Sequence, residues 1–342
     1  MIISYFEIIL AFLLSFLVFF TFKKYNIFYN LKKDPHQNFT FEKIVLPIGG
    51  YYLIISILIL NFYNLSSEFI YISIIFIIGA LSDIKKFNSP KYRLLVQSVL
   101  ILLFVYNFNI ELSSTRLEFL DYLLNNIYFN IFFVGFCILI VINGTNFIDG
   151  LNGLVLLYYI SISFILINSG LEIKIFGNEN FLIQLVIILT VIFLINAFNK
   201  LYLGDSGSYL IGFIFAIFLL KIYMINQHIS PYFIILLLWY PCFENLFSII
   251  RKNSFKKSPI KPDTKHLHQL LFYYLTKKFN FKNKLVSNSL TSILINFYNL
   301  TIFLIGFNQL TKTNLQILLI LMNLIIYLIL YYQLFKFRYK NI

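Results

Sequence analysis

The sequence predicts an all-α polytopic integral membrane protein with about 10–11 transmembrane helices. The chain has 342 residues, of which 60% are hydrophobic and only 12% are charged, whereas about a quarter of the residues of a soluble domain carry a charge. The mean hydropathy is +0.83. Apolar tracts of about 20 residues, the length that spans a bilayer as a helix, recur along the chain. No strand-like alternation indicates a barrel, so helices are the expected spanning elements.

The expected helices follow one another along the whole chain, which we take as a single domain over residues 1–342. The first tract, residues 2–20, has no basic segment before it and no small-residue cleavage site after it. We therefore interpret it as a retained span and not as a signal peptide. The predicted apolar segments are 2–22, 44–62, 67–81, 94–109, 127–142, 153–169, 181–198, 208–224, 231–250, 288–306 and 314–334.

When these segments are taken as spans, the basic residues gather on one side of the membrane. Of the 27 Lys and Arg residues, the opposite side receives only Arg116, Lys174, Lys221 and Lys312. The positive-inside rule then places the basic side in the cytoplasm and the N-terminus outside the inner (plasma) membrane. The basic residues behind the net charge of +13 are expected to face anionic lipid headgroups. Nucleic acid is a poor alternative partner, because the sequence has no basic folded domain to hold it.

Nearly all polar motifs lie in the loops of the predicted cytoplasmic side. They read PIGG (Pro47–Gly50), GALSDIKKFNSPKYRLLVQ (Gly79–Gln97), NGTNFIDGLNG (Asn143–Gly153), LYLGDSGSYLIG (Leu201–Gly212) and PDTKHLHQ (Pro262–Gln269). The two cysteines, Cys137 and Cys242, lie in apolar segments instead. Neither a disulfide framework nor metal-ligand spacing of cysteines is therefore expected.

Three aspartates, Asp83, Asp149 and Asp205, stand at the cytoplasmic ends of predicted spans. Carboxylates near the hydrocarbon region are costly and tend to mark functional sites. Asp and Asn oxygens suit a hard cation such as Mg²⁺, which usually takes one or two carboxylates together with water and substrate phosphates. Nearby glycines let backbone approach a phosphate, and nearby Lys and His side chains neutralise its charge. The motifs together predict a site for a substrate with a pyrophosphate group.

Several of these residues also have a purely structural interpretation. Asp83 could end a helix with its charge in water, and Lys85 could serve only as a topology signal. Asn152 could be a turn residue, and His266 and His268 could be solvated loop residues. Gly49 and Gly50 are interpreted mainly as residues that allow close helix packing. Asp149 and Asp205 are harder to explain structurally, because Gly, Ser or Asn residues surround each of them between two spans.

Taken in order, the motifs resemble those of the polyprenyl-phosphate N-acetylhexosamine-1-phosphate transferases (glycosyltransferase family 4). This family includes the phospho-MurNAc-pentapeptide translocase and the enzymes that initiate teichoic-acid, common-antigen and O-antigen synthesis. PIGG, NSPKYRLLVQ, NGTNFIDGLNGL, LGDSGSYLIGF and PDTKHLHQLL are similar to family motifs, and the resemblance covers residues 34–271. A long loop with a His-Leu-His segment is closest to the undecaprenyl-phosphate GlcNAc-1-phosphate transferase type.

The resemblance implies transfer of N-acetylhexosamine-1-phosphate from a UDP-sugar to a polyprenyl phosphate, undecaprenyl phosphate in bacteria. UMP leaves, and the product starts a cell-surface polysaccharide. Mg²⁺, or Mn²⁺ in its place, would bridge the pyrophosphate. A homodimer is a possible assembly, and the choice among GlcNAc, QuiNAc and FucNAc stays open.

The resemblance also implies roles for individual residues. Asp205 would be the leading Mg²⁺ ligand, with Asn146 beside the metal and the diphosphate, and Asp149 would contact the nucleotide. The expected catalytic residues are Asp83, Asp149, Asp205, His266 and His268. The expected substrate-binding residues are Asn146, Lys85, Asn152, Gly204 and Ser206.

The sequence departs from the family pattern at three positions. Ser82 replaces the first member of an aspartate pair, a position proposed to act as a base on the lipid phosphate. A phosphate monoester is already largely ionised near pH 7, because its second pKa is about 6, so this loss need not abolish activity. Asn152 replaces a second aspartate, and Gln269 replaces the last histidine of a His-x-His-His run.

Two other functions remain open from the sequence alone. The departures at Ser82 and Gln269 are compatible with a non-catalytic relative, or with one of altered specificity. A transporter is the second alternative. Transporters place polar breaks near the bilayer midplane and often have repeated halves, whereas these motifs lie at one face and no repeat is visible.

Overall fold

The computed structural model describes residues 5–25, 45–64, 66–87, 89–171, 178, 180–254, 263–281 and 283–339. These residues form helices, without a β-strand among them; one isolated parallel bridge joins Leu46 to Leu201. The helices are α1 (Tyr5–Lys24), α2 (Gly49–Leu60), the 3₁₀ helix η2 (Phe62–Asn64), α3 (Glu68–Asp83), α4 (Pro90–Asn107), α5 (Glu118–Leu124), α6 (Ile127–Ile148), α7 (Leu154–Ile167), α8 (Phe181–Ala197), α9 (Gly204–Ile225), α10 (Pro231–Leu237), α11 (Trp239–Ser254), α12 (Leu267–Lys278), α13 (Lys284–Phe307) and α14 (Thr313–Tyr339).

The predicted fold class is confirmed: the chain is an all-α, multi-pass membrane protein. Among the described helices, α6, α9, α13 and α14 are long and apolar enough to cross a membrane, and the bent pair α10 and α11 is a fifth candidate. Each of the other predicted apolar segments also coincides with a helix. Most of those helices are shorter, so the full number of spans stays a prediction.

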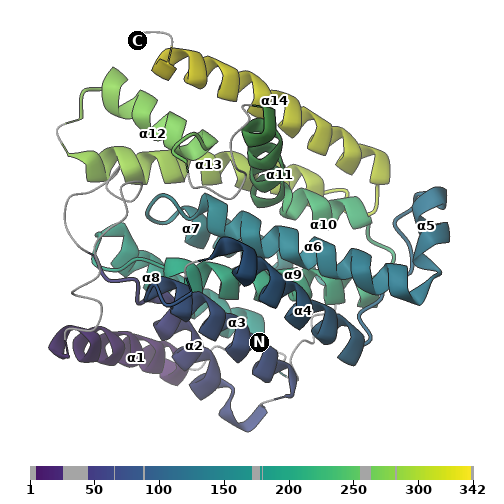
Figure 1. The fold of residues 1–342 in the computed structure, drawn as a ribbon, viewed down its shortest axis with the longest axis horizontal. Coiled ribbons are helices and arrows are strands. Elements are labelled where there is room, and N and C mark those ends of the chain that lie inside the picture. Colours follow the sequence, from purple (N-terminus) through teal and green to yellow (C-terminus); the bar gives the residue numbers. More distant parts are fainter. Residues whose placement is uncertain are drawn as a thin grey trace.

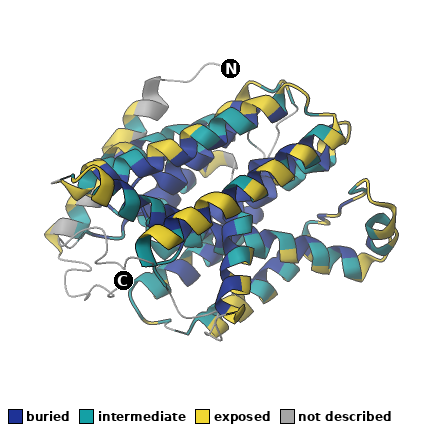
Figure 2. Ribbon diagram, turned by 90° about the horizontal axis from the view of Figure 1, so that it is seen from above, coloured by how far each residue is buried: buried dark blue, intermediate teal, exposed yellow. Residues whose placement is uncertain are grey.

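Helix α9 forms the centre of the helical body. Of its apolar window 78% is buried inside the protein, against 28% for the peripheral α14. It packs mainly against α3 and α6 (Figure 1). Close approach depends on glycines, because a Cβ on Gly79 would lie 2.4 Å from the Ser206 Cα, and one on Gly212 would lie 2.8 Å from the Ile142 Cα. The exposed residues lie on the outer faces of the helices (Figure 2), where a membrane protein meets lipid.

The predicted span 231–250 is not one straight helix. α10 and α11 meet at a 73° bend beside Leu238. Pro241 supplies the physical reason, because a proline has no N–H to donate and its ring clashes with the carbonyl four residues earlier. That carbonyl belongs to Leu237, and it accepts a hydrogen bond from the Tyr158 hydroxyl at 2.8 Å instead. Gly144 lets α6 pass the bend, since a Cβ there would lie 2.3 Å from the Pro241 carbonyl oxygen.

Three predicted loops are partly helical. Asn143 to Ile148 form the last turns of α6, Arg93 lies in the first turn of α4, and Asp205 lies in the first turn of α9. Polar residues lower helix propensity only weakly, and tertiary packing overrides it. The Asn143 side chain bonds back to the Leu139 carbonyl at 2.9 Å, which satisfies its amide within the helix. The motif residues therefore project from helix ends and not from free loops.

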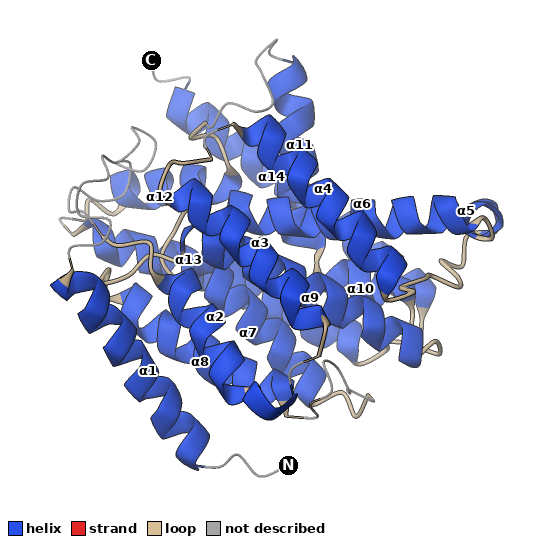
Figure 3. Ribbon diagram, turned by 60° about the horizontal axis from the view of Figure 1, so that its bottom comes forward, coloured by secondary structure: helices blue, strands red, loops and turns tan. Residues whose placement is uncertain are grey.

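The motif residues lie at helix ends: at the ends of α3, α6 and α11, and at the starts of α4, α9 and α12. The functional side chains therefore gather at one end of the body. At the opposite end of α6, α5 projects from the body (Figure 3). The 22 residues of α6 span about 33 Å at 1.5 Å per residue, close to the thickness of a bilayer core.

Candidate functional site

Asp205 lies at the centre of the gathered side chains, in the first turn of α9. Its Oδ1 accepts a hydrogen bond from Asn146 Nδ2 at 2.9 Å. Its Oδ2 accepts hydrogen bonds from Arg93 Nη1 at 2.7 Å and from Ser82 Oγ at 2.5 Å. The partners come from α6, α4 and α3, so one carboxylate ties together four helices. A helix N-terminus favours negative charge, and the Asp205 side chain keeps 32% of its surface exposed.

Asp83, at the end of α3, closes the N-terminus of α9. Its Oδ1 accepts the Asp205 backbone N–H at 2.8 Å, and its Oδ2 accepts the backbone N–H and the hydroxyl of Ser206 at 3.1 and 2.6 Å. These are donors that a helix leaves without intrahelical partners. Gly204 makes the approach possible at φ 76°, because a Cβ there would lie 2.8 Å from Asp83 Oδ2. The structure thus brings four predicted site residues, Asp83, Gly204, Asp205 and Ser206, together in a cap.

Asp149 follows directly after α6, as its C-cap residue. Burial raises the pKa of the Asp149 carboxyl well above its ordinary value, and the charges of Asp205 and Asp83 raise it further. The three predicted aspartates therefore lie close enough to interact electrostatically. A cation or a cationic side chain that enters this region lowers the cost of keeping all three ionised.

Asn152 lies in the turn between α6 and α7 and is almost fully buried. Its backbone N–H donates to Asn288 Oδ1 at 2.8 Å, and its side-chain amide donates to Asn199 Oδ1 at 3.3 Å. The next residue, Gly153, has φ 76° and donates its N–H to Asn196 Oδ1 at 2.6 Å. This geometry supports the turn interpretation of Asn152. Its predicted contact with substrate has no geometric support here and stays a prediction.

The PIGG segment packs against residues 201–203, which directly precede α9. Gly49 and Gly50 donate their N–H groups to the carbonyls of Tyr202 and Leu203, at 2.9 and 3.1 Å. A Cβ on Gly50 would lie 2.4 Å from the Gly207 nitrogen. The interpretation of these glycines as close-packing residues is confirmed, and their packing holds the first turn of α9 in place.

His266 begins α12 and is buried, so the alternative of a solvated loop residue is wrong. Its Nδ1 lies 2.9 Å from Glu244 Oε1, and Glu244 also accepts the Tyr327 hydroxyl at 2.8 Å. Gln269 accepts the His266 backbone N–H at 3.3 Å in a capping box. The departure at Gln269 therefore has a structural role: its side chain closes the start of α12.

His268 is fully buried against the turn that follows Asp149. The alternative interpretation of His268 as a solvated loop residue is therefore also wrong. A Cβ on Gly150 would lie 2.4 Å from His268 Nε2. The His268 ring stacks on that of His266 with centroids 5.6 Å apart, and the His266 ring stacks in turn on Phe147 at 5.5 Å. Burial and, to a smaller extent, the neighbouring His266 together lower the pKa of His268 to about 3, so His268 is neutral at pH 7.

Lys85 lies two residues after the end of α3 and is half-buried. It adopts φ 57°, a left-handed conformation that non-glycine residues seldom take. Its backbone N–H donates to the Ser82 carbonyl at 2.9 Å. Lys85 therefore lies at the same end of α3 as the Asp83 cap.

Three charged groups at this end were not among the predicted site residues: Arg93, Glu244 and Arg251. From the sequence, Arg93 contributed only to the excess of basic residues on the predicted cytoplasmic side, and nothing in its local sequence indicates a contact with Asp205. Glu244 had a readable signal, because it is the sole acidic residue of the predicted span 231–250 and intramembrane carboxylates tend to be functional. Arg251 pairs with Asp263 at 3.0 Å, twelve residues away across a loop.

The residues around Asp205 fit a magnesium ion shared with a substrate. The described residues hold no group of three or more His, Cys, Asp or Glu that forms a protein-only metal site. Mg²⁺ rarely needs one, because one or two protein ligands, water and phosphate oxygens complete its octahedron. Asp205 supplies a partly exposed carboxylate. Asn146 donates its amide nitrogen to that carboxylate, and its amide oxygen would be the second ligand. Asp83 fits less well, since its two oxygens accept backbone N–H groups of the α9 N-terminus, whereas Asp205 is held by side chains and keeps 32% of its side-chain surface exposed.

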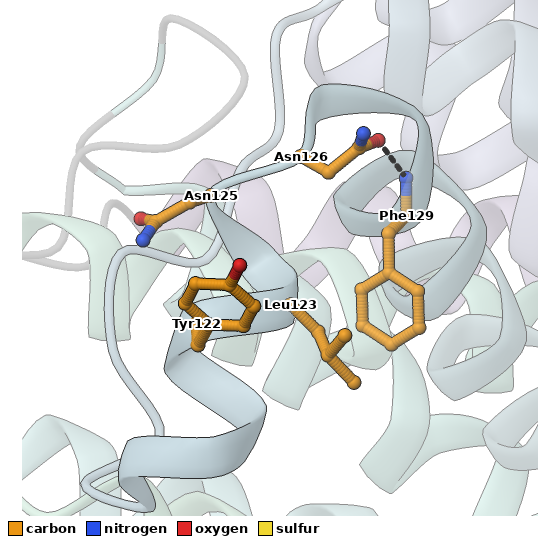
Figure 4. Close-up of a pocket in the computed structure, with 5 residues that line it drawn as sticks. All are labelled: Tyr122, Leu123, Asn125, Asn126 and Phe129. Carbon is orange, nitrogen blue, oxygen red and sulfur yellow. Dashed lines mark hydrogen bonds between the residues drawn. The ribbon is translucent and has the colours of Figure 1, made fainter.

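A pocket of about 680 Å³ lies elsewhere, where α5 meets α6. Its lining is Tyr122, Leu123, Asn125, Asn126 and Phe129 (Figure 4). Asn126 accepts the Phe129 backbone N–H at 3.1 Å and caps α6. This lining offers neither a carboxylate nor a cation. It is also about 30 Å along α6 from Asn146, at 1.5 Å per residue, so we do not assign the reaction to it.

The chain is similar in sequence to known transferases. The family described as Glycosyl transferase family 4 matches residues 65–223, a range that includes Asp83, Arg93, Asn146, Asp149 and Asp205. The chain is 27% identical over 241 residues to the undecaprenyl-phosphate alpha-N-acetylglucosaminyl 1-phosphate transferase of Thermotoga maritima, covering 69% of this chain and 71% of that protein. It is 31% identical over 140 residues to the probable undecaprenyl-phosphate N-acetylglucosaminyl 1-phosphate transferase of Bacillus subtilis, covering 39% and 38%, respectively.

Proposed function

We propose that the chain, which is similar to glycosyl transferase family 4 over residues 65–223, transfers N-acetylhexosamine-1-phosphate from a UDP-sugar to undecaprenyl phosphate, as the first membrane step of cell-surface polysaccharide synthesis. The observation that carries the proposal is the convergence on Asp205. Asn146, Arg93 and Ser82 reach its carboxylate from three other helices at one end of the helical body. A site at the end of membrane spans lets a soluble nucleotide sugar meet a lipid whose tail stays in the bilayer.

The reaction forms one P–O bond and breaks another. An oxygen of the lipid phosphate attacks the β-phosphorus of the UDP-sugar, and the bond from that phosphorus to the bridging oxygen breaks. UMP leaves with the bridging oxygen, and polyprenyl-diphospho-sugar remains in the membrane. Phosphoryl transfer of this kind depends mainly on positioning and on neutralising charge.

The protein supplies both contributions from the residues around Asp205. The Arg93 guanidinium is permanently charged, and it stands 2.7 Å from Asp205, where it can neutralise diphosphate oxygens. Glu244 orients the His266 ring through a 2.9 Å contact. We assign His266 to the diphosphate or sugar, and His268 to support of the turn that carries Asp149.

We assign a bound Mg²⁺, which Mn²⁺ can replace, to Asp205 with Asn146. When bound, the metal would neutralise the diphosphate and polarise its phosphorus. Asp83 holds the ligand in place from behind, because it caps the helix turn in which Asp205 lies. Asp83 is therefore a positioning residue in this proposal.

Ser82 changes the chemistry of the acceptor side. Its hydroxyl donates to Asp205 and so cannot serve as the carboxylate base that the family position suggests. A lipid phosphate with a second pKa of about 6 is already ionised at pH 7. The acceptor therefore needs orientation and not deprotonation, and Ser82 helps to fix the carboxylate at the centre of the site.

We place the site on the cytoplasmic face of the inner (plasma) membrane, with the N-terminus outside. The basic loops support this orientation through the positive-inside rule. For the donor we favour UDP-GlcNAc, since both compared relatives are named as N-acetylglucosaminyl 1-phosphate transferases.

The test uses purified protein in detergent with undecaprenyl phosphate, Mg²⁺ and UDP-sugars labelled at the β-phosphate. At least one donor of a GlcNAc, QuiNAc and FucNAc panel should yield labelled lipid. Asp205→Asn should abolish the product, while Asp121→Asn, on α5 at the opposite end of α6, should retain it. Equal activity of Asp205→Asn and wild type would refute the metal assignment, and no product from any donor would favour a non-catalytic relative. Passage of a labelled sugar into liposomes without labelled lipid would favour a transporter.

A further inference from the structure

The last quarter of the chain is basic and contains no acidic residue. From Thr264 to Ile342 the sequence has neither Asp nor Glu. Over the same stretch it has Lys265, Lys277, Lys278, Lys282, Lys284, Lys312, Lys336, Arg338 and Lys340. A positive charge without intervening acids attracts anions more strongly than a mixed surface does.

Helices α12 and α14 bring several of these cations together with aromatic rings. The two helices pack against each other (Figure 1). We define the basic-aromatic patch as Lys277, Lys278, Lys336, Arg338, Tyr274 and Phe337. Tyr274 and Phe337 contact edge-to-face at 5.0 Å, and Lys278 Nζ donates to the Tyr274 hydroxyl at 2.6 Å. The side chains of Lys277, Lys278 and Lys336 are exposed.

The depth of the patch follows from α14. This helix exposes an apolar side that includes Leu321, Ile325 and Ile329, with 52, 57 and 52% of their surfaces exposed. That side suits lipid chains, and about 20 residues of helix cross the hydrocarbon core. Counted from Thr313, the core ends near Tyr332. Lys336 therefore comes at the level of the headgroups, where aromatic and basic residues are enriched.

No acidic side chain on α12 or α14 neutralises the patch, since neither helix contains one. The nearest acid along the chain is Asp263, and it already pairs with Arg251 at 3.0 Å. Glu244 is buried and engaged by His266 and Tyr327. The exposed lysines of the patch, Lys277, Lys278 and Lys336, therefore present their charge to the surroundings of the helices.

From this geometry we propose that the basic-aromatic patch binds the phosphate of an anionic phospholipid from the surrounding leaflet. The exposed lysines contact the phosphate, the ring edges of Tyr274 and Phe337 lie at the glycerol level, and the apolar side of α14 receives the acyl chains. A lipid fits better than a soluble anion, because exposed apolar surface and an exposed lysine follow one another along α14.

The patch is also connected to the candidate site. Arg338 Nη1 donates to the Thr264 carbonyl at 2.7 Å, two residues before His266. A lipid bound at the patch therefore stabilises the end of α14 that holds this loop. The binding itself does not depend on the proposed reaction, so it is measured without an activity assay.

Native mass spectrometry of the full chain tests the proposal, with phosphatidylglycerol and phosphatidylcholine added separately to detergent-solubilised protein. We expect preferential retention of phosphatidylglycerol. Lys336→Gln should weaken it about fivefold, and the triple change Lys277→Gln, Lys278→Gln and Lys336→Gln should weaken it about 100-fold. Lys312→Gln is the matched control, an exposed lysine at the other end of α14, and should retain wild-type binding.

Equal retention of the two lipids by the wild type would overturn the proposal. So would equal phosphatidylglycerol retention by Lys336→Gln and Lys312→Gln, which are both single surface changes. Millimolar inorganic phosphate should not displace the lipid. Displacement by phosphate would show a site for soluble anions and would also overturn the assignment.

Discussion

Gly204 offers a sharp test of how the Asp83 cap supports the site. The change Gly204→Ala adds one methyl group at φ 76°, 2.8 and 3.0 Å from the two oxygens of Asp83. Gly170→Ala is the matched control, because Gly170 also has a positive φ of 65° but its Cβ would meet nothing within 4 Å. The two variants share the backbone strain and differ in the contact with Asp83.

The magnitude follows from these contacts. A left-handed conformation costs an alanine about 1–2 kcal/mol, and the smaller entropy of the unfolded variant offsets about 0.4–1 kcal/mol. Gly170→Ala should therefore lower the free energy of unfolding by about 1 kcal/mol. Gly204→Ala also stretches three hydrogen bonds that Asp83 accepts from Asp205 and Ser206. Burial raises the pKa of Asp83 to about 7, so the carboxyl is only partly ionised at pH 7. At about 0.5–1.5 kcal/mol for each hydrogen bond, their loss brings the total to about 3–5 kcal/mol.

Activity should separate the variants further. Moving Asp83 shifts the first turn of α9, and a displacement of about 1 Å at reacting groups costs roughly 100-fold in rate. We expect kcat/KM of Gly204→Ala to fall about 100-fold, with that of Gly170→Ala within twofold of wild type. Thermal unfolding in detergent and formation of labelled lipid measure the two effects. Equal unfolding temperatures and equal activities of the two variants would refute the role of the cap.

Three further predictions concern neighbouring groups. Arg93→Ala should lower kcat/KM about 10–100-fold in the labelled-lipid assay, because a cation beside Asp205 is lost. Arg93→Lys should recover part of the activity. Full activity of the alanine variant would exclude a role of Arg93 in neutralising the diphosphate. Glu244→Gln should lower kcat/KM about tenfold with the fold retained, because the partner that orients His266 loses its charge; circular dichroism and the labelled-lipid assay check this, and an unchanged rate would contradict it. The pKa of His268 is lowered to about 3, so the contribution of its neutral ring to stability should be full above pH 6.5 and should fall by about 1.4 kcal/mol per pH unit below it. His268→Asn should remove this contribution, which a comparison of the thermal stability profiles of variant and wild type between pH 7 and 5 measures; equal slopes of the two profiles would contradict a buried neutral ring.

The sequence predicted the helices well because hydropathy reports directly whether a segment leaves water. It could not predict the bend at Pro241 within an apolar run, since both halves stay equally apolar. It also placed the end of α6 too early. The side chains of Asn143 and Asn146 look like loop residues until their partners, the Leu139 carbonyl and Asp205, are known.

The sequence predicted three aspartates at the cytoplasmic ends of spans as parts of one site, and the structure gives them different surroundings. Asp205 lies at the centre, whereas Asp83 accepts backbone N–H groups and acts as a cap. The sequence could not predict this difference, because the pairing joins residues 122 positions apart. The partner of Arg93 is also distant in sequence, 112 positions away, and no local pattern indicates such pairs.

The most direct test of the proposed reaction follows each phosphorus of the donor separately. Two samples of the UDP-sugar, one labelled at the α-phosphate and one at the β-phosphate, are given to the purified protein with undecaprenyl phosphate and Mg²⁺. The β-label should enter the lipid and the α-label should leave as UMP, in equal amounts. Entry of the α-label into the lipid, or release of both labels into water, would contradict attack on the β-phosphorus.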